Sequence, residues 1–238
     1  MKAFAVTHVG KVRQINEDAY YLPKNGEGFA AVADGMGGHQ AGEVASAIAI
    51  REFTAEIRGK VPSEDALKEA VRRANTAIYE EGARDPLKRG MGTTLTALWY
   101  DTDNIYLTHV GDSRAYLLRN QALMQLSNDH SLVSELVALG EITPEQALTH
   151  PQRNFITRAL GTGKRTEADI LHLDFQSGDV WLLCSDGLTN HMRAAEIAEV
   201  LLRSAPWPDK LQSLIDTALD RGGRDNITAV AVLREATT

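Results

Sequence analysis

The stretch that decides the fold is Val32-Ala33-Asp34-Gly35-Met36-Gly37-Gly38-His39, an apolar run followed by an aspartate and a glycine-rich turn. The apolar residues 29–33 predict a buried strand, and Asp34 stands where that strand is expected to end. The glycines let the backbone turn sharply and expose its own carbonyl groups. A carboxylate beside a bared carbonyl suits a hard divalent cation that takes oxygen ligands. The same pattern also fits a tight strand-to-helix turn with a surface aspartate.

Further elements follow from the hydrophobic periodicity on both sides of this turn. Strands are expected at residues 2–9, 19–22, 29–33, 92–99, 104–110, 114–118, 122–126, 170–173, 180–184 and 227–233, and helices at 41–57, from 64 after the N-cap Ser63, 131–139, from 144, 194–202 and 209–219. The four strands between 92 and 126 are expected to form a meander. Strands that do not alternate with helices argue against a doubly wound parallel sheet. They predict an α+β fold in which two mostly antiparallel sheets pack together with helix pairs outside.

Length and composition place limits on the function. We expect the 238 residues to form one domain, and the net charge of −7 disfavours nucleic acid as a partner, because backbone binding needs a basic face. The single cysteine, Cys184, fits a reducing cytosol. No apolar run approaches the length of a membrane span. The expectation is a cytoplasmic monomer without a membrane or nucleic-acid partner.

Five aspartates share one context, at the end or the start of an expected strand. They are Asp18, Asp34, Asp112, Asp186 and Asp225. Each alone also fits an ordinary turn residue, because Asp-Gly and Gly-Asp are common turn pairs. Gathered at one end of a sandwich, however, they would repel one another unless cations lay among them. Without a Cys/His cluster of zinc spacing, the ions implied are Mg²⁺ or Mn²⁺. Two such ions can share a bridging water, lower its pKa and stabilise a phosphoryl centre.

Two further side chains fit that chemistry. Arg13, five residues before Asp18, is placed to grip a phosphate bidentately, although it also fits a solvated surface arginine. His39 ends the glycine turn and is placed to protonate a leaving alkoxide, although it also fits a histidine at a helix start.

Two motifs that suggest other phosphate chemistry fail on inspection. Gly161-Thr162-Gly163-Lys164 looks like a phosphate loop, but Arg165 stands where serine or threonine is required. Cys184 has Asn190 where a thiolate phosphatase needs arginine, so core packing explains it better.

The motifs taken together resemble a known family. They are Arg13 with Asn16-Glu17-Asp18, Asp34-Gly35-Met36-Gly37-Gly38-His39, Gly92-Thr93-Thr94, Gly111-Asp112-Ser113-Arg114, Ser185-Asp186-Gly187-Leu188 and Asp225-Asn226-Ile227-Thr228. In this order they resemble the metal-dependent serine/threonine protein phosphatases, the PPM family with its type-2C enzymes. The length resembles the minimal bacterial catalytic domain.

The resemblance implies a four-layer α-β-β-α sandwich with a dinuclear Mn²⁺ or Mg²⁺ centre. Asp34 would bridge both ions and the Gly35 carbonyl would bind one, while Asp186 and Asp225 would bind the other. Asp18 would act through coordinated water, and Asp112 with Asp186 would match a third, weaker metal site. Arg13 would hold the substrate phosphate and His39 would donate the proton. An insert at about residues 134–164 matches a flap that influences substrate choice in this family.

The leading hypothesis is therefore a phosphoprotein phosphatase that acts on phosphoserine and phosphothreonine and opposes Ser/Thr kinases in cytoplasmic signalling. The water that attacks phosphorus would be a metal-bridging hydroxide, with no phosphoenzyme intermediate. One alternative is a catalytically silent module that binds a phosphopeptide or a metal in a signalling complex. Another is a metal-dependent phosphodiesterase or nuclease, which the negative charge disfavours.

Overall fold

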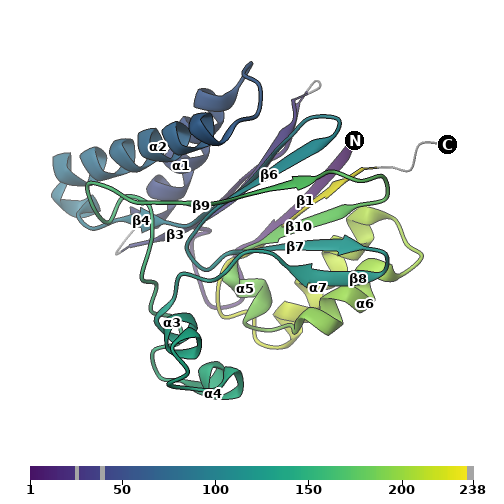
Figure 1. Cartoon of the computed structure of the whole chain (residues 1–238). Helices are drawn as coiled ribbons and strands as arrows, with labels where there is room; N and C mark the ends of the chain where they lie inside the picture. Colours follow the sequence, from purple (N-terminus) through teal and green to yellow (C-terminus); the bar gives the residue numbers. More distant parts are fainter. Residues whose placement is uncertain (25–26, 38–40, 235–238) are drawn as a thin grey trace.

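Two antiparallel sheets form the centre of the molecule (Figure 1). The computed structural model describes residues 1–24, 27–37 and 41–234. The first sheet has the strand order β1 (Lys2–His8), β11 (Ile227–Leu233), β10 (Val180–Cys184), β7 (Arg114–Arg119) and β8 (Ala122–Gln125). The second has the order β2 (Asp18–Tyr21), β3 (Phe29–Met36), β5 (Leu95–Tyr100), β6 (Asn104–Val110) and β9 (Asp169–Asp174), with β4 (Gly92–Thr93) paired to the end of β3.

Helices cover the outer face of each sheet (Figure 1). On the second sheet lie α1 (Ala41–Ile57) and α2 (Glu64–Arg84), which is followed by a short 3₁₀ turn at Pro86–Lys88. On the first sheet lie α5 (Asp186–Thr189), α6 (Ala194–Leu202) and α7 (Trp207–Asp220). Two short helices, α3 (Leu132–Ala138) and α4 (Pro144–Thr149), project away from the layers (Figure 1). The four-layer α-β-β-α sandwich is therefore confirmed.

The alternation of side chains along the strands divides the apolar residues into three cores. In β3, Ala31 and Ala33 face α1 and α2, whereas Ala30 and Val32 face the opposite sheet. Trp181 is fully buried between the sheets. Because Asp34 follows Val32 by two residues, its side chain lies on the inter-sheet face, at the end of the apolar core.

The predicted meander is wrong. Strands β5 and β6 pair in one sheet, whereas β7 and β8 pair in the other. Residues 111–113 cross from sheet to sheet, and Gly111 takes a φ of 109° at this crossing, a conformation that suits glycine. The crossing places Asp112 at the same end of the sandwich as Asp34. The connection that the sequence predicted wrongly is therefore the one that brings these two carboxylates together.

Other differences from the predicted elements are local. The sequence did not predict α5 or the 3₁₀ turn, and the strand expected at 92–99 is divided at Thr94 into β4 and β5. The turn signal at residues 25–26 lies outside the described residues. No helix in the described part of the chain combines the length and the apolar character that crossing a membrane requires.

Candidate active site

The site begins with two carboxylates on neighbouring strands. Asp18 on β2 lies directly opposite Asp34 on β3, so both side chains project from the same face of the sheet. Like charges in this position destabilise a sheet. The main chain of Asp34 is fixed by the threonine pair at 93–94: its N–H donates to Thr94 Oγ1 at 2.9 Å, and its carbonyl accepts from Thr93 Oγ1 at 2.8 Å.

The opposite sheet holds the Asp18 carboxylate in place. Ser185, which follows β10, donates from Oγ to Asp18 Oδ2 at 2.8 Å, and Thr228 on β11 donates to the same oxygen at 2.6 Å. Asp186 is the first residue of α5, and Asp225 precedes β11 by two residues. Four of the five predicted aspartates therefore meet where the two sheets end together: two lie in strands of the second sheet, and two lie next to strands of the first.

Burial and mutual repulsion make this cluster reluctant to carry its full negative charge. Burial raises the pKa of Asp34 well above its ordinary value, and the carboxylates of Asp18 and Asp186 raise it further. Burial likewise raises the pKa of Asp18 to about 7, against the hydrogen bonds from Thr228 and Ser185. Burial and the charge of Asp225 raise the pKa of Asp186 to about 6. A cation at this position would remove the cost of ionising these groups.

The glycines of the motifs are required by close backbone approaches. A side chain at Gly35 would meet the carbonyl oxygen of Gly42 at 2.1 Å and that of Glu17 at 2.6 Å. A side chain at Gly187 would meet the carbonyl oxygen of Asn226 at 2.0 Å. Because both contacts involve main chain, no larger residue fits without moving the strands that carry the aspartates.

Arg13 lies over the same end of the sandwich. Its Nη2 is 2.9 Å from Asp225 Oδ2, and its Nη1 is 3.6 Å from Glu17 Oε2. The segment that carries Arg13 is fixed by Asn226, whose side chain donates to the carbonyls of Val9 and Ile15 at 2.9 Å each. Arg13 is therefore positioned beside the carboxylates with half of its side chain exposed, as a phosphate ligand needs to be.

Glu17 is a site residue that the sequence reasoning missed. Its Oε1 is shielded from solvent and accepts no hydrogen bond from any described residue, and Asp18 Oδ1 is in the same condition. Buried carboxylate oxygens without donors are costly, so these two atoms suit a cation or its bound water. In sequence Glu17 is one polar residue in a polar run, and only its neighbour Asp18 marks it out.

The donor set fits Mg²⁺ or Mn²⁺. Carboxylate oxygens gathered at the ends of the two sheets are the ligands that hard divalent ions take. Across the residues with assigned positions, no three His, Cys, Asp or Glu side chains stand together as a preformed metal-ligand group.

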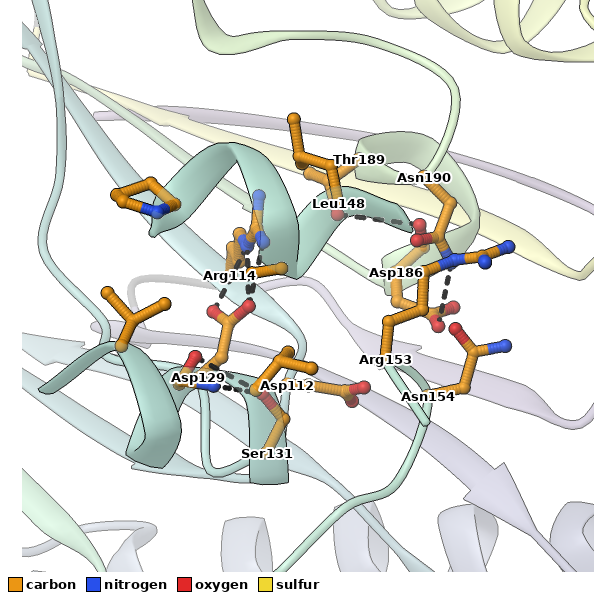
Figure 2. Close-up of a pocket in the computed structure, with 15 residues that line it drawn as sticks. Asp112, Arg114, Asp129, Ser131, Leu148, Arg153, Asn154, Asp186, Thr189 and Asn190 are labelled. Carbon is orange, nitrogen blue, oxygen red and sulfur yellow. Dashed lines mark hydrogen bonds and ion pairs between the residues drawn. The ribbon is translucent and has the colours of Figure 1, made fainter. Parts of the chain in front are cut away.

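The fifth predicted aspartate, Asp112, stands beside Asp186. Burial raises the pKa of Asp112 to about 8, and the charge of Asp186 adds to this effect. Both residues line a cavity of about 370 Å³ between the sheet ends and the two projecting helices, and Figure 2 shows their carboxylates in the same opening. Arg114, which also lines it, is held by Asp129 in a bidentate pair at 2.7 to 3.0 Å. The predicted proton donor His39 lies outside the described residues.

Known proteins match this chain over nearly its whole length. The family model for protein phosphatase 2C matches residues 8–229. The chain is 41% identical to the serine/threonine phosphatase stp of Listeria monocytogenes, covering 97% of this chain and 95% of that protein. Its structure is similar to the crystal structure of the serine/threonine phosphatase PstP/Ppp of Mycobacterium tuberculosis, with a TM-score of 0.90 over 98% of this chain and 99% of that one. The two sequences are 41% identical.

A further solved structure bears on the metal. The catalytic domain of serine threonine protein phosphatase PstP, described in complex with two manganese ions, is 39% identical, covers 97% of this chain and 96% of that one, and gives a TM-score of 0.87. The matches cover nearly the whole chain, and the family motifs lie together at one end of the sandwich. Both observations identify the family. The chain belongs to the protein phosphatase 2C family.

Proposed function

We propose that this protein hydrolyses phosphoserine and phosphothreonine in phosphoproteins, with Mn²⁺ or Mg²⁺ as cofactor. One observation carries the proposal: five aspartates that are far apart in sequence lie at the meeting ends of two sheets, next to an arginine. The relatives named as serine/threonine phosphatases support the same activity. They do not support the alternative of a catalytically silent binding module, which would normally have lost one of these carboxylates.

The residues proposed to hold the two core ions are Asp34, the Gly35 carbonyl, Asp186 and Asp225, with Asp18 acting through water. When bound, such ions lower the pKa of a water molecule and neutralise charge on a phosphoryl group. Asp112 and Asp186 are proposed for a third, weaker site. Glu17 is added to the core set because of its unpartnered Oε1.

The chain's own side chains supply binding and proton transfer. Arg13 would release Asp225 and turn its two Nη groups to the phosphate oxygens, which it grips bidentately. Asp18 is held by Ser185 and Thr228 through Oδ2, so its Oδ1 is the atom that accepts a hydrogen bond from the attacking water. His39 is the proposed donor of the proton that the serine or threonine alkoxide takes as it leaves.

We further propose that residues 1–238 act as one catalytic domain, as a monomer in the cytoplasm. A sequence with one cysteine, Cys184, has no internal disulfide and fits a reducing compartment. Sedimentation velocity tests the oligomeric state, and a species of about 26 kDa supports the proposal.

The test of the activity is phosphate release from synthetic phosphoserine and phosphothreonine peptides in the presence of Mn²⁺. Release from both peptides supports the proposal, and no release from either refutes it. Bis-p-nitrophenyl phosphate, a diester, serves as the second substrate. Faster hydrolysis of the diester than of the peptides would favour the phosphodiesterase alternative.

A further inference from the structure

The loop that carries Asp112 from one sheet to the other is held on both sides of this residue. On one side, Ser113 Oγ is hydrogen-bonded to Thr94 Oγ1 at 2.8 Å. On the other side, both polar main-chain groups of Gly111 contact His130. The Gly111 N–H donates to the ring Nδ1 at 3.0 Å, and the Gly111 carbonyl accepts the N–H of His130 at 2.7 Å. The position of Asp112 therefore depends on His130 as well as on Thr94.

His130 is itself fixed in the fold. It is 7% exposed, and its carbonyl accepts the N–H of Thr157 at 2.8 Å. Its neighbours Asp129 and Ser131 line the cavity beside the carboxylates (Figure 2). The ring of His130 instead packs against that of the buried His109, with the two centroids 4.8 Å apart. The imidazole therefore contacts the loop from the inside of the protein.

The contacts of the ring determine which nitrogen carries its proton. The Gly111 N–H can only donate, so Nδ1 must accept, and the proton of the neutral ring is then on Nε2. Nε2 lies 3.1 Å from Oδ2 of Asp169 on β9, which accepts its N–H. Arg158 Nη1 lies 3.0 Å from the same nitrogen and donates to Asp169 Oδ1 at 2.7 Å. Burial lowers the pKa of His130, which favours the neutral ring.

A carboxylate that orients a histidine in this way is found around metal ions and in catalytic triads, where it fixes the tautomer and the direction of the ring. In this protein the oriented ring holds a main-chain N–H instead of a metal or a nucleophile. That N–H belongs to Gly111, the residue directly before Asp112. The contact therefore acts on a carboxylate of the candidate site.

We propose that His130 is a positioning residue for Asp112: with its tautomer fixed by Asp169, it holds the loop where the Asp112 carboxylate can bind a cation. The inference rests on the proposed function, in which Asp112 and Asp186 hold a third, weaker ion. His130 and Asp169 then set the affinity of that site without contacting the ion. The two core ions are proposed to bind through other residues, so their affinity should depend on neither.

Asp169→Asn tests the tautomer without changing the size of the side chain. Because Arg158 donates to one oxygen at this position, the asparagine would turn its oxygen to Arg158 and its NH₂ group to Nε2 of the histidine. Nε2 would then have to accept, which moves the ring proton to Nδ1 and turns it against the Gly111 N–H. The matched control is Asp174→Asn, an exposed aspartate at the other end of β9.

His130→Asn is the conservative variant. The side-chain oxygen of asparagine can replace Nδ1 as the acceptor of the Gly111 N–H, but the shorter side chain does not reach Asp169. This variant should therefore keep the weaker site. Because Asp169 acts through the ring, adding Asp169→Asn to His130→Asn should have no further effect.

Two measurements separate positioning from a general loss of structure. Long-range ¹H–¹⁵N correlation spectra of the metal-free protein report the tautomer of each histidine, and His130→Asn identifies the signals of His130. We expect Nε2–H in the wild type and in Asp174→Asn, and Nδ1–H in Asp169→Asn. Calorimetric titration with Mn²⁺ should show that Asp169→Asn weakens the third site by about tenfold or more and leaves the two tighter sites unchanged.

An Nδ1–H tautomer of His130 in the wild type would overturn the proposal. So would an unchanged third site in Asp169→Asn, an equal loss at all three sites, or a wild type that binds two ions and no third. A further loss when Asp169→Asn is added to His130→Asn would show that Asp169 does not act through the ring, and this too would overturn it. A wild type that binds no Mn²⁺ and releases no phosphate refutes the proposed function instead, so the two failures are distinguishable.

Discussion

Asp18 and Asp34 lie directly opposite each other in the antiparallel pairing of β2 with β3, with both carboxylates on the inter-sheet face. Fold stability alone does not account for this arrangement, because like charges in paired positions repel. Instead, hydroxyl groups of the opposite sheet hold Asp18, and Thr93 and Thr94 hold the main chain of Asp34. The protein thus fixes two repelling groups in place, as expected where a cation is to be bound.

Replacement of a core carboxylate should abolish turnover with little change in the fold. Asp34→Asn and Asp225→Asn keep the size of the side chain but remove a charged ligand, so kcat on p-nitrophenyl phosphate should fall by about 10³ or more. Asp103→Asn is the control, because Asp103 is 81% exposed and lies in the turn between β5 and β6. Activity of the core variants within threefold of the wild type would contradict their role.

Glu17→Gln should weaken manganese binding. The substitution leaves the shape of the side chain unchanged, but an amide is a poorer ligand than the carboxylate whose Oε1 has no partner. Calorimetric titration should show at least a tenfold loss of affinity for Mn²⁺, an effect of the size seen when groups that support a metal are removed. Unchanged affinity in this variant would place Glu17 outside the metal site.

Arg13→Ala should act mainly on substrate binding. The guanidinium is charged in both the free and the bound enzyme and is positioned to hold the phosphate, so its loss should raise KM by about tenfold or more with a smaller change in kcat. Arg13→Lys should recover part of the affinity, because it keeps the charge but not the bidentate geometry. A defect confined to kcat would show that Arg13 acts in the chemical step instead.

The metal-free protein should lose stability as the pH rises from 6.5 to 8.5. The pKa values of Asp18 and Asp112 are raised to about 7 and about 8, so the folded state holds protons that the unfolded chain has already released. The stability from this source is complete below the pKa of unfolded aspartate and is lost as the pH passes through these values. Burial lowers the pKa of His109 to about 4, so below pH 6.5 this histidine takes up a proton in the unfolded chain but not in the folded protein. Its effect on stability is opposite in sign to that of the carboxyl groups, and the comparison therefore starts at pH 6.5.

Thermal denaturation in EDTA at pH 6.5, 7.5 and 8.5 measures this dependence. The melting temperature should fall across the series, and added Mn²⁺ should raise it most at pH 8.5, where the ligands are deprotonated. A metal-free protein that becomes more stable towards pH 8.5 would show that the pKa values of Asp18 and Asp112 are not raised in the folded state.

Much of the fold could be predicted from the sequence because its elements carry strong periodicity. Helix α1 and strands β6, β10 and β11 have the predicted bounds, and Cys184 is a fully buried strand residue with its pKa raised to about 12, as core packing requires. The crossing at Gly111 could not be predicted, because a turn between two strands reads the same whether the second strand joins the same sheet or the facing one.

The candidate site could be predicted as far as its residues stand next to glycine or at a strand end. Asp34, Asp112 and Asp186 meet that criterion, and the structure brings them together with Asp18 and Asp225. Glu17 does not meet it, because the burial of its Oε1 depends on the packing around Gly35 and Gly42, which the sequence does not reveal.

Titration of the metal-free wild type with Mn²⁺ by isothermal calorimetry, with phosphatase activity measured on the same samples, is the decisive measurement. At least two ions should bind per chain, activity should be absent in EDTA and return as these sites fill, and Asp34→Asn should lose both. Full activity in EDTA, or a titration in which manganese finds no site, would contradict a carboxylate cluster built to hold catalytic cations.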